Sequence, residues 1–504
     1  MSNQMSIFDF MYERYQPKKK IRLIELFAGV GSQYKALKEI TKGTDYQVES
    51  YKICEWAVPS IKAYNSIHLK DFNNYSKDKT LDEMLAKVKM VSLNYDNPIS
   101  ETQLKRKGES WVRDVYNNIA ATHNLVNIME IKGSDLEIVD TDKYEYIMSY
   151  SFPCQDLSKA GKRGGLEVSQ KDGGTRSGLL WEVERILNEL DYEHRPNVLL
   201  MENVPDLIEV NFIKQWHKWL ERLEELGYKT NVIDVLNAKD YGIPQNRKRV
   251  FCISIKGEYA YSMPYKQTLK HRLGDLLEKE ADEKYFLTPE HIKRIESWKS
   301  YERPLENVMN EKSISSTIRT HVGKDSAEMK LVGFEDKDFV SKHYENYAKE
   351  HNGEIPEMFN PYNETKVEEV APTQTTKCGS TTSSSTVLIK NNNKKGYAEA
   401  QQGDGIDIST RMQYHRGTVQ KGLSQTLTCE GGNNVGIVVN GKSEWNKTHL
   451  RIRKLTPCEC IKLMGFEKCD YEAMRDIDMT DMQIYHCAGD SIVVTVLMGF
   501  LANC

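Results

Sequence analysis

Residues 21–32, IRLIELFAGVGS, decide the fold of this chain. The apolar run from Ile21 to Phe27 has the length and composition of a buried strand, and a glycine pair follows it directly. A strand that passes through glycines into a helix predicts a turn where backbone amides approach a ligand at the helix N-terminus. We therefore predict a nucleotide-like cofactor here, although a glycine pair at such a turn can also serve tight packing alone.

The alternation of apolar strand and amphipathic helix continues as far as Asn237. Helical patterns lie at 178–190 and 212–226, and further short apolar runs are YKICEW (51–56), YEYIMSYSF (144–152) and NVLLMEN (197–203). Residues 229–255 then contain two strand-like runs around a Gly- and Pro-containing loop, which is typical of an antiparallel hairpin. The sequence therefore predicts an α/β fold with a doubly wound, mostly parallel, mixed sheet.

Composition divides the 504-residue chain into parts. After Lys256 the alternation fades and small polar residues accumulate, and regular patterns return at 455–466 and 491–501. We predict four parts. They are an N-terminal extension over 1–20, a catalytic and cofactor-binding domain over 21–256, a smaller irregular domain over 257–447, and a segment over 448–504 that packs back onto the catalytic domain.

Charge and cysteine content limit the possible partners. A formal net charge of -4 excludes a uniformly basic coat, so any nucleic-acid contact has to come from local clusters at 162–163, 247–249 and 451–454. The 10 cysteines lack zinc-finger spacing, and we interpret them as reduced thiols without a metal. Neither a leader pattern nor a membrane-length apolar run is recognised, so we expect a cytoplasmic protein that needs no membrane.

Reactive side chains follow the predicted strands at one edge of the sheet. Cys154 follows one apolar strand, Glu202 ends another, and the hairpin carries Arg247 and Arg249. Glu55 ends the second strand, where a carboxylate can accept both hydroxyls of a ribose. Each has an ordinary structural alternative: a buried packing thiol, an ion pair, or a solvated surface charge.

One reaction needs a thiol, a carboxyl group and a cation together. Carbon 5 of cytosine is a poor nucleophile, and a sulfonium methyl donor cannot alkylate it until a thiolate has added to carbon 6. A carboxyl group with a raised pKa assists by protonating ring nitrogen 3, and a base later removes the hydrogen from carbon 5. Because the target base is stacked inside a duplex, the nucleotide must swing out into the pocket.

The order of the motifs identifies a family. FAGVGS, CEW, SFPCQDLS, MENV, QNRKRVF, RIRKLTPCECIKLMGF and AGDSIVV follow one another along the chain. This order resembles the carbon-5 cytosine-specific DNA methyltransferase family over most of 21–256 and 449–500. The resemblance implies a Rossmann-like catalytic domain, S-adenosyl-L-methionine as cofactor, double-stranded DNA as substrate, and a target-recognition domain at 257–447. It also implies a restriction-modification context and a monomer, cytoplasmic in a bacterium or phage-encoded in a bacterial host.

The resemblance carries roles over residue by residue. It makes Cys154 the nucleophile and Glu202 the group that acts on ring nitrogen 3, while Arg247 and Arg249 hold the flipped cytidine. Cofactor contacts would come from Phe27, Ala28, Gly29, Gly31, Glu55, Trp56, Asp135, Pro153, Leu179, Asp490 and Ser491. DNA contacts would come from Gln155, Ser158, Lys162 and Arg163 in a closing loop, and from Gln245, Thr426 and Thr428.

Two departures and one internal similarity stand out. The family usually has Asn where this chain has Asp490, and a long insertion separates Trp56 from Asp135. Segments with spaced threonines recur at 313–320, 370–376 and 423–429; they are either related recognition-loop elements or a chance likeness of Ser/Thr-rich loops.

Three other functions compete with this interpretation. A tRNA cytosine-5 methyltransferase would use the same chemistry, but that branch typically differs after its catalytic cysteine and lacks so large an insert. A catalytically silent DNA-binding homologue would have no physical reason to keep the cysteine, glutamate and arginines together. A dinucleotide-dependent oxidoreductase would need a complete G-x-G-x-x-G pattern, which FAGVGS does not supply.

Overall fold

The computed structural model describes residues 12–95, 97–153, 176–209, 212–286, 315–316, 331–335 and 450–503, together with short strands between 359 and 437. The chain divides into two compact units. The first comprises residues 1–281, 309–330 and 454–504, and the second comprises residues 282–308 and 331–453. The roles assigned to the four predicted parts stay predictions.

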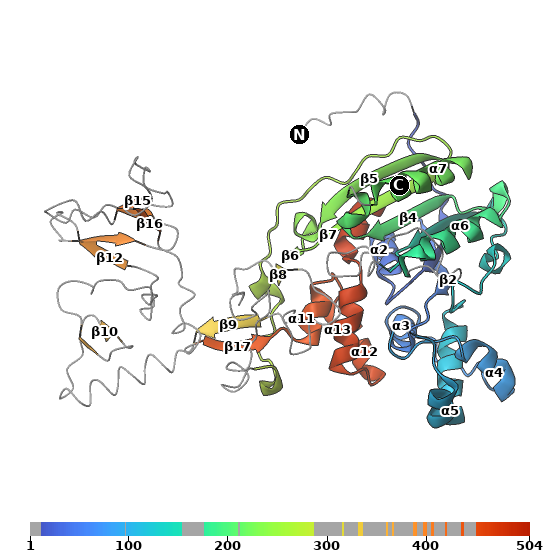
Figure 1. Ribbon diagram of the computed structural model, residues 1–504, viewed down its shortest axis with the longest axis horizontal. Helices are drawn as coiled ribbons and strands as arrows, with labels where there is room; N and C mark the ends of the chain where they lie inside the picture. Colours follow the sequence, from blue (N-terminus) through green and yellow to red (C-terminus); the bar gives the residue numbers. More distant parts are fainter. Residues whose placement is uncertain are drawn as a thin grey trace. The chain divides into compact units, whose positions relative to one another are not determined.

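The first unit is built on a six-stranded sheet with the order β2-β1-β3-β4-β7-β5 (Figure 1). β1 pairs in parallel with β2 and β3, and β3 with β4, whereas β7 is antiparallel to both β4 and β5. The predicted mixed, mostly parallel sheet is therefore confirmed. The strands are β1 (Lys20–Leu26), β2 (Gln47–Cys54), β3 (Tyr144–Tyr150), β4 (Val198–Asn203), β5 (Tyr228–Asn237) and β7 (Lys248–Lys256).

Helices cover both faces of this sheet, because successive strand residues point to opposite sides. Cys252 of β7 shares one buried cluster with Val183 and Trp219, which come from the two helices on that face (Figure 1). The preceding residue, Phe251, faces the other side, where its ring lies 5.5 Å from that of Phe500. The helices are α6 (Leu180–Asn188) and α7 (Ile213–Glu225) on the first face, and α2 (Ser32–Thr41) and α14 (Val494–Leu501) on the second.

A long insertion lies between β2 and β3. It contains α3 (Val58–Tyr64), the π-helical turn η1 (Asn65–Leu69), α4 (Leu81–Val88), and α5 (Glu101–Ala121), which is interrupted at Gly108. Its helices share a buried apolar cluster that includes Val88 and Val115. The loop between α4 and α5 is bonded to the main sheet region: the amide of Ser92 donates to the carbonyl of Trp56 over 2.7 Å. The insertion is thus anchored directly behind the end of β2.

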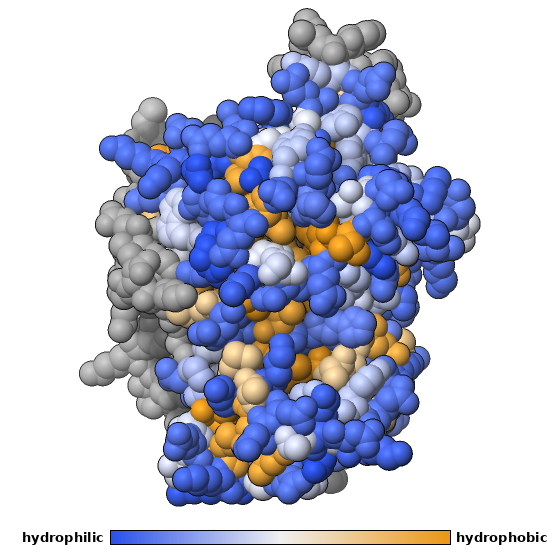
Figure 2. Space-filling view, turned by 90° about the vertical axis from the view of Figure 1, so that its right-hand side faces the viewer, coloured by the Kyte–Doolittle hydropathy of each residue, from blue (hydrophilic) through white to orange (hydrophobic). Residues whose placement is uncertain are grey.

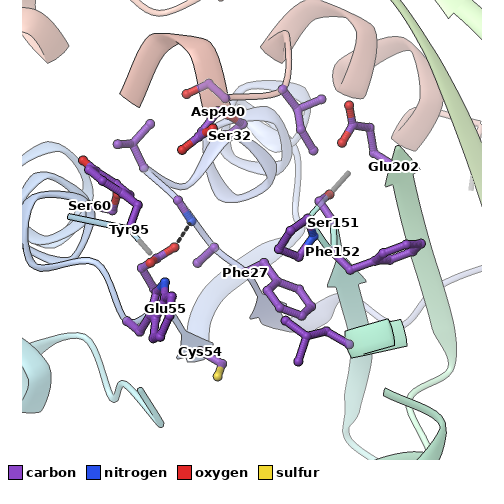
Figure 3. Close-up of a pocket in the computed structure, with 18 of the residues that line it drawn as sticks. Phe27, Ser32, Cys54, Glu55, Ser60, Tyr95, Ser151, Phe152, Glu202 and Asp490 are labelled. Carbon is purple, nitrogen blue, oxygen red and sulfur yellow. Dashed lines mark hydrogen bonds between the residues drawn. The ribbon is translucent and has the colours of Figure 1, made fainter. Parts of the chain in front are cut away.

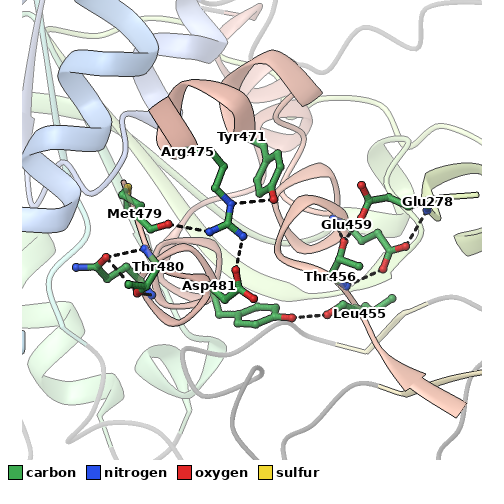
Figure 4. A network of polar contacts seen from close by, with 11 residues as sticks. Glu278, Leu455, Thr456, Glu459, Tyr471, Arg475, Met479, Thr480 and Asp481 are labelled. Carbon is green, nitrogen blue, oxygen red and sulfur yellow. Dashed lines mark hydrogen bonds and ion pairs between the residues drawn. The ribbon is translucent and has the colours of Figure 1, made fainter. Parts of the chain in front are cut away.

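The C-terminal segment returns to the sheet through α11 (Pro457–Lys462), α12 (Lys468–Asp476), α13 (Asp481–Asp490) and α14. Polar contacts fix these helices (Figure 4). Thr456 and Glu459 form a capping box at the start of α11, and the amide of Glu278 donates to Glu459 Oε1 over 2.8 Å. Arg475 of α12 pairs with Asp481 at the start of α13. Together these contacts set the direction of α13, whose last turn reaches the pocket described below.

The stretch Asp481–Leu501 is long and apolar enough to cross a membrane by length and composition. In the structure it is divided at residues 491–493 into α13 and α14, and 72% of its most apolar window is buried. Core packing therefore accounts for its apolar character. Figure 2 shows one face of the molecule, on which hydrophilic residues predominate and apolar patches are interspersed.

The remaining described elements are short. In the first unit, β6 (Gln245–Asn246) pairs with β8 (Ser315–Ser316), and short 3₁₀ helices include η2 (Gly133–Leu136), η4 (Arg176–Leu179) and η6 (Pro205–Ile208). The described residues of the second unit form small sheets, consistent with an irregular domain. They are β9 (Leu331–Glu335) with β17 (Leu450–Lys454), β10 (Phe359–Asn360) with β11 (Thr365–Lys366), β12 (Val387–Lys390) with β13 (Tyr397–Ala400), and β14 (Gly405–Asp407) between β15 (Val419–Gln420) and β16 (Val435–Ile437).

Candidate active site

A cavity of about 560 Å³ lies in the first unit at the carboxyl edge of the parallel strands (Figure 3). Its walls come from the ends of β1, β2, β3 and β4, from the start of β7, and from the end of α13. This is the edge at which α/β sheets bind their ligands. The volume lies in the range of small-molecule and cofactor pockets.

The loop after β1 forms one wall of the cavity. Phe27, Ala28 and Gly29, three of the predicted cofactor contacts, line it. Phe27 and Gly29 have φ of 59° and 56°, and a side chain on Gly29 would meet no neighbouring atom, so the backbone faces open pocket space. Gly31 does not line the cavity. A Cβ there would lie 2.6 Å from the ring of His68, so the close packing of the loop requires glycine at this position.

Glu55 and Trp56 line the cavity at the end of β2. One carboxylate oxygen of Glu55 accepts from the amide of Gly29 over 2.9 Å, and the other accepts from the amide of Ala57 over 2.7 Å. Burial raises the pKa of Glu55, and the two amides oppose that shift. Because each carboxylate oxygen has further lone-pair capacity, Glu55 can still accept two hydroxyl groups.

Asn124 fixes the backbone of Glu55. Its side-chain oxygen accepts from the Glu55 amide over 3.0 Å, and its side-chain nitrogen donates to the Glu55 carbonyl over 2.8 Å. Residues 126–129, which follow Asn124, line the cavity. Sequence reasoning missed this segment because no strand or glycine signal marks it.

Asp135 is not brought together with the other predicted cofactor residues. It lies in η2, where its carboxylate accepts from the backbone amide of Lys132 over 2.7 Å. It borders a separate cavity of about 640 Å³, behind residues 124–125. The carboxylate of Asp135 thus caps a local turn and does not line the first cavity, whereas segment 126–129 does; the predicted adenine contact stays a prediction.

Glu202 and Arg249 form the ionisable end of the cavity. Glu202 ends β4 with 8% of its surface exposed, and its carboxylate lies 3.2 Å from Nε of Arg249. Burial raises the pKa of Glu202, while Arg249, Arg247 and the hydroxyl of Ser151 lower it to a smaller extent. A carboxyl group with a raised pKa beside a guanidinium can hold a proton for donation or take one up.

Arg247 is buried behind this pair. Its Nη2 donates to the carbonyls of Gly489 and Ser491 over 3.1 and 2.9 Å. The predicted substrate-binding arginine therefore also fixes the turn after α13, while it still lines the cavity. Asp490 and Ser491 in that turn line the cavity as predicted.

Gln245, predicted to contact DNA, is fully buried instead. Its side-chain amide donates to the carbonyl of Leu463 over 2.7 Å, so it joins the start of the hairpin to the C-terminal segment. A buried amide that already has this partner is not available to DNA in the described structure. The sequence could not reveal this contact, because its two members are far apart along the chain.

Pro153 and Leu179, two further predicted cofactor contacts, line the cavity. The predicted nucleophile Cys154 lies outside the described residues, immediately after Pro153. Gln155, Ser158, Lys162, Arg163, Thr426 and Thr428 also lie outside them. Their roles stay predictions.

Several lining residues carried no recognised signal in the sequence. Tyr95 comes from the insertion and stacks on His486, with ring centroids 3.5 Å apart and planes 11° apart. His486 precedes Asp490 by one helical turn, and its Nδ1 lies 3.0 Å from Asp490 Oδ2. The spacing of His486 and Asp490 was visible in the sequence, but the approach of Tyr95 was not.

The side chains that line the cavity suit an elongated nucleoside ligand. Glu55 offers acceptors for two hydroxyls, Trp56 and Leu179 offer apolar walls for an aromatic base, and Asp490 offers a carboxylate for a cationic group. In Figure 3, Glu202 lies on the other side of the cavity from Glu55. This leaves Glu202 and its partner Arg249 for a second reactant.

The family model described as C-5 cytosine-specific DNA methylase matches residues 79–504. Among curated relatives, the orphan methyltransferase M.SssI of Spiroplasma monobiae is 38% identical over 249 residues, which cover 48% of this chain and 61% of that protein, less than two thirds of its length. Type II methyltransferase M2.ScrFI of Lactococcus lactis subsp. cremoris is 38% identical over 271 residues, covering 53% of this chain and 70% of that protein.

A solved structure shares the fold. The Entamoeba histolytica methyltransferase EhMeth aligns with a TM-score of 0.50 at 12% identity, covering 96% of this chain and 97% of that one. At this level of identity the likeness concerns the fold alone.

Proposed function

Because the chain belongs to the C-5 cytosine-specific DNA methylase family, we propose that it transfers a methyl group from S-adenosyl-L-methionine to carbon 5 of a flipped cytosine in a specific DNA sequence. The observation that carries this proposal is one cavity with two chemically distinct ends. Gly29 and Glu55 cradle one end, and the buried Glu202–Arg249 pair stands at the other.

The cofactor supplies an electrophilic methyl group when bound. The residues present fit it: Glu55 would accept the ribose hydroxyls, Phe27, Trp56 and Leu179 would surround the adenine, and Asp490 would face the amino-acid part. The family membership supports this choice of cofactor over a nicotinamide dinucleotide.

The chain's own groups divide the work on the base. The thiolate of Cys154 adds to carbon 6 of the cytosine and pushes electron density toward carbon 5. Glu202, whose pKa is raised by burial, donates a proton to ring nitrogen 3 and so favours that addition. After carbon 5 has gained the methyl group it loses its hydrogen as a proton to a base, and the carbon 6–sulfur bond breaks to release Cys154.

Arg249 orients both partners of the proton transfer. It lies against Glu202 and can hold the base oxygen with the rest of its guanidinium. Arg247 donates to the carbonyls of Gly489 and Ser491 and so holds the turn at 489–491, which carries Asp490, against the hairpin that carries Arg249.

Trapping the covalent adduct tests the proposal. Purified protein is incubated with cofactor and duplex oligonucleotides containing 5-fluorocytosine, and the products are separated on a denaturing gel. Fluorine cannot leave as a cation, so the Cys154 adduct should accumulate as a stable protein–DNA conjugate. Cys154→Ser should form no conjugate and lose at least about 10⁴-fold in turnover, while binding S-adenosylhomocysteine normally.

Absence of a conjugate across diverse duplex sequences, or normal turnover by Cys154→Ser, would contradict the proposal. Replacing the duplex with tRNA in the same assay separates DNA from RNA specificity. Bisulphite sequencing of DNA from expressing cells then identifies the target sequence.

The substrate-side assignments belong to the same proposal. Residues 257–447 would read the DNA sequence, with Thr426 and Thr428 at the DNA backbone and the loop after Cys154 closing over the flipped nucleotide. We further propose a monomer that acts in the bacterial cytoplasm. If Ala at both Thr426 and Thr428 left DNA affinity and methylation rate unchanged, their assignment would be abandoned.

A further inference from the structure

The insertion between β2 and β3 contributes a side chain to the pocket, and the proposed function gives that side chain no role. Asn94 and Tyr95, in the loop between α4 and α5, line the same cavity as Gly29 and Glu55. The loop is closed at its base by the amide of Ile99, which donates to the carbonyl of Val91 over 2.7 Å. The insertion therefore forms part of the cavity wall.

The backbone of Tyr95 is held in an unusual conformation. Its φ is 66°, in the left-handed region that disfavours non-glycine residues. Ser92 and Asn94 stabilise the turn: Oγ of Ser92 donates to the carbonyl of Asn97 over 2.6 Å, and Oδ1 of Asn94 accepts from the amide of Asn97 over 3.2 Å. Strain of this kind persists where the surroundings impose it, and it concentrates at functional sites.

The conformation directs the Tyr95 ring onto His486. The two rings are nearly parallel, with centroids 3.5 Å apart, and the Tyr95 hydroxyl lies 3.9 Å from Sγ of Cys487. Burial raises the pKa of Tyr95, so the phenol stays neutral. On its other side His486 faces Asp490, with 3.0 Å between Nδ1 and Oδ2. Tyr95, His486 and Asp490 thus form a continuous row of contacts along the cavity wall; Tyr95 and Asp490 are labelled in Figure 3.

We propose that Tyr95 of the insertion, through its stack on His486, is a positioning residue that holds Asp490 toward the amino-acid end of the cofactor. The inference rests on the proposed function for the identity of the cofactor. It assigns the insertion a task, namely to complete the cofactor pocket. It also explains how a carboxylate serves at a position where the family usually has an amide.

The charges around Asp490 agree with this assignment. The charge of Asp490 contributes to the raised pKa of Glu55, so two carboxylates lie close enough to interact in this part of the cavity. A ligand ammonium group would offset part of this negative charge. A cationic ligand group is therefore favoured here.

Comparing two ligands isolates the contribution of this end of the pocket to the binding affinity. S-adenosylhomocysteine carries the amino-acid end, whereas 5′-methylthioadenosine keeps the adenine, ribose and sulfur but lacks it. Calorimetric titration of the full-length protein measures both affinities without any turnover. Tyr95→Ala and Asp490→Asn should each weaken S-adenosylhomocysteine about tenfold and change 5′-methylthioadenosine affinity less than about twofold.

Three variants distinguish a role of Tyr95 in positioning the ligand from a role in the stability of the fold. Tyr95→Phe keeps the stacked ring and should bind both ligands like the wild type. Tyr95→Gly suits the positive φ, so it should fold at least as well as the wild type while showing the same ligand-specific loss as Tyr95→Ala. Phe72→Ala is the matched control, because Phe72 is an aromatic residue of the same insertion with 67% of its surface exposed.

The outcomes are distinct. Wild-type protein that binds neither ligand would contradict the proposed cofactor itself. Wild-type binding that is equally weakened for both ligands by Tyr95→Ala, or unchanged by Tyr95→Gly and Asp490→Asn, would overturn this inference alone. In turnover assays Tyr95→Ala and Tyr95→Gly should raise KM for the cofactor and leave kcat within about twofold, whereas Tyr95→Phe should leave both unchanged.

Discussion

The parallel and antiparallel halves of the sheet build the two ends of the pocket in different ways. Over the parallel strands β1 and β2, backbone groups do most of the work: Gly29 faces the cavity with its main chain, and amides hold both oxygens of Glu55. Over the antiparallel pair β4 and β7, buried ionisable side chains form the site, with Glu202 against Arg249. Under the proposed function, the backbone-lined end would hold the cofactor by its shape. The Glu202 end would supply a proton donor with a raised pKa to the base.

The strand directions explain this difference. Parallel strands present their carboxyl ends at one edge, so loops and their amides gather there. β7 runs the opposite way, so it brings the start of a strand to the same edge, and Arg249 enters beside Glu202. The four changes below test how independent the two halves are, beginning with the largest expected effect.

Glu202→Gln should disable the antiparallel half and spare the parallel half. The amide cannot donate a carboxylic proton to ring nitrogen 3, so we expect kcat to fall about 10²–10⁴-fold. S-adenosylhomocysteine affinity should stay within about twofold, because Glu55 and Gly29 are untouched. Single-turnover methylation and calorimetry measure the two effects. A parallel loss of cofactor affinity would show that the halves are not separable.

Arg249→Gln should shift the pH dependence of the same half. Arg249 is the largest influence that lowers the pKa of Glu202, so its loss should move the Glu202 limb of the kcat/KM profile to higher pH. We also expect about a 10²-fold fall in kcat/KM at neutral pH, because the uncompensated carboxyl group and the base lose a charged partner. Arg249→Lys keeps the charge and should leave the limb in place; an unmoved limb in Arg249→Gln would assign it to another group.

Glu55→Gln should weaken the parallel half alone. One of the two amides that point at the carboxylate would face an NH₂ group, which costs about 1–3 kcal/mol and should lower S-adenosylhomocysteine affinity about tenfold or more. Turnover at saturating cofactor should change little. Glu49→Gln is the control, because Glu49 lies on the same strand but is half exposed. Equal effects of the two variants would remove Glu55 from the ligand set.

Glu25→Gln probes the support beneath the parallel half. Glu25 is fully buried in β1 and accepts from Tyr64, and burial raises its pKa from 4.5 to about 7. The folded state therefore binds a proton that the unfolded state has released. This contribution to stability is complete below about pH 4.5 and is lost as pH rises through about 7.

The unfolding free energy of the wild type should fall between about pH 5.5 and about pH 8. In Glu25→Gln this fall should be smaller by about 1–3 kcal/mol, because the titrating carboxyl group is gone. Urea denaturation at the two pH values measures it. The partly buried Glu39 of α2, changed to Gln, provides the control. An identical pH slope in wild type and Glu25→Gln would mean that Glu25 does not carry this linkage.

The sequence by itself determined the family, the mixed sheet and the residues at strand ends. Strand periodicity and glycine turns are local, so Gly29, Glu55 and Glu202 could be assigned to one edge before any contact was known. Pro153, Leu179 and Asp490 followed from the resemblance, and the structure brings them into the same cavity.

Only the tertiary structure decided how distant segments share the work. Gln245 is buried against Leu463, Arg247 holds the turn at 489–491, and Asp135 lies outside the cavity. The stack of Tyr95 on His486 joins an insertion to the last helices of the unit. Local sequence cannot encode such contacts visibly, because they depend on how packed helices and loops meet in space, whereas the end of a strand is set by the residues within it.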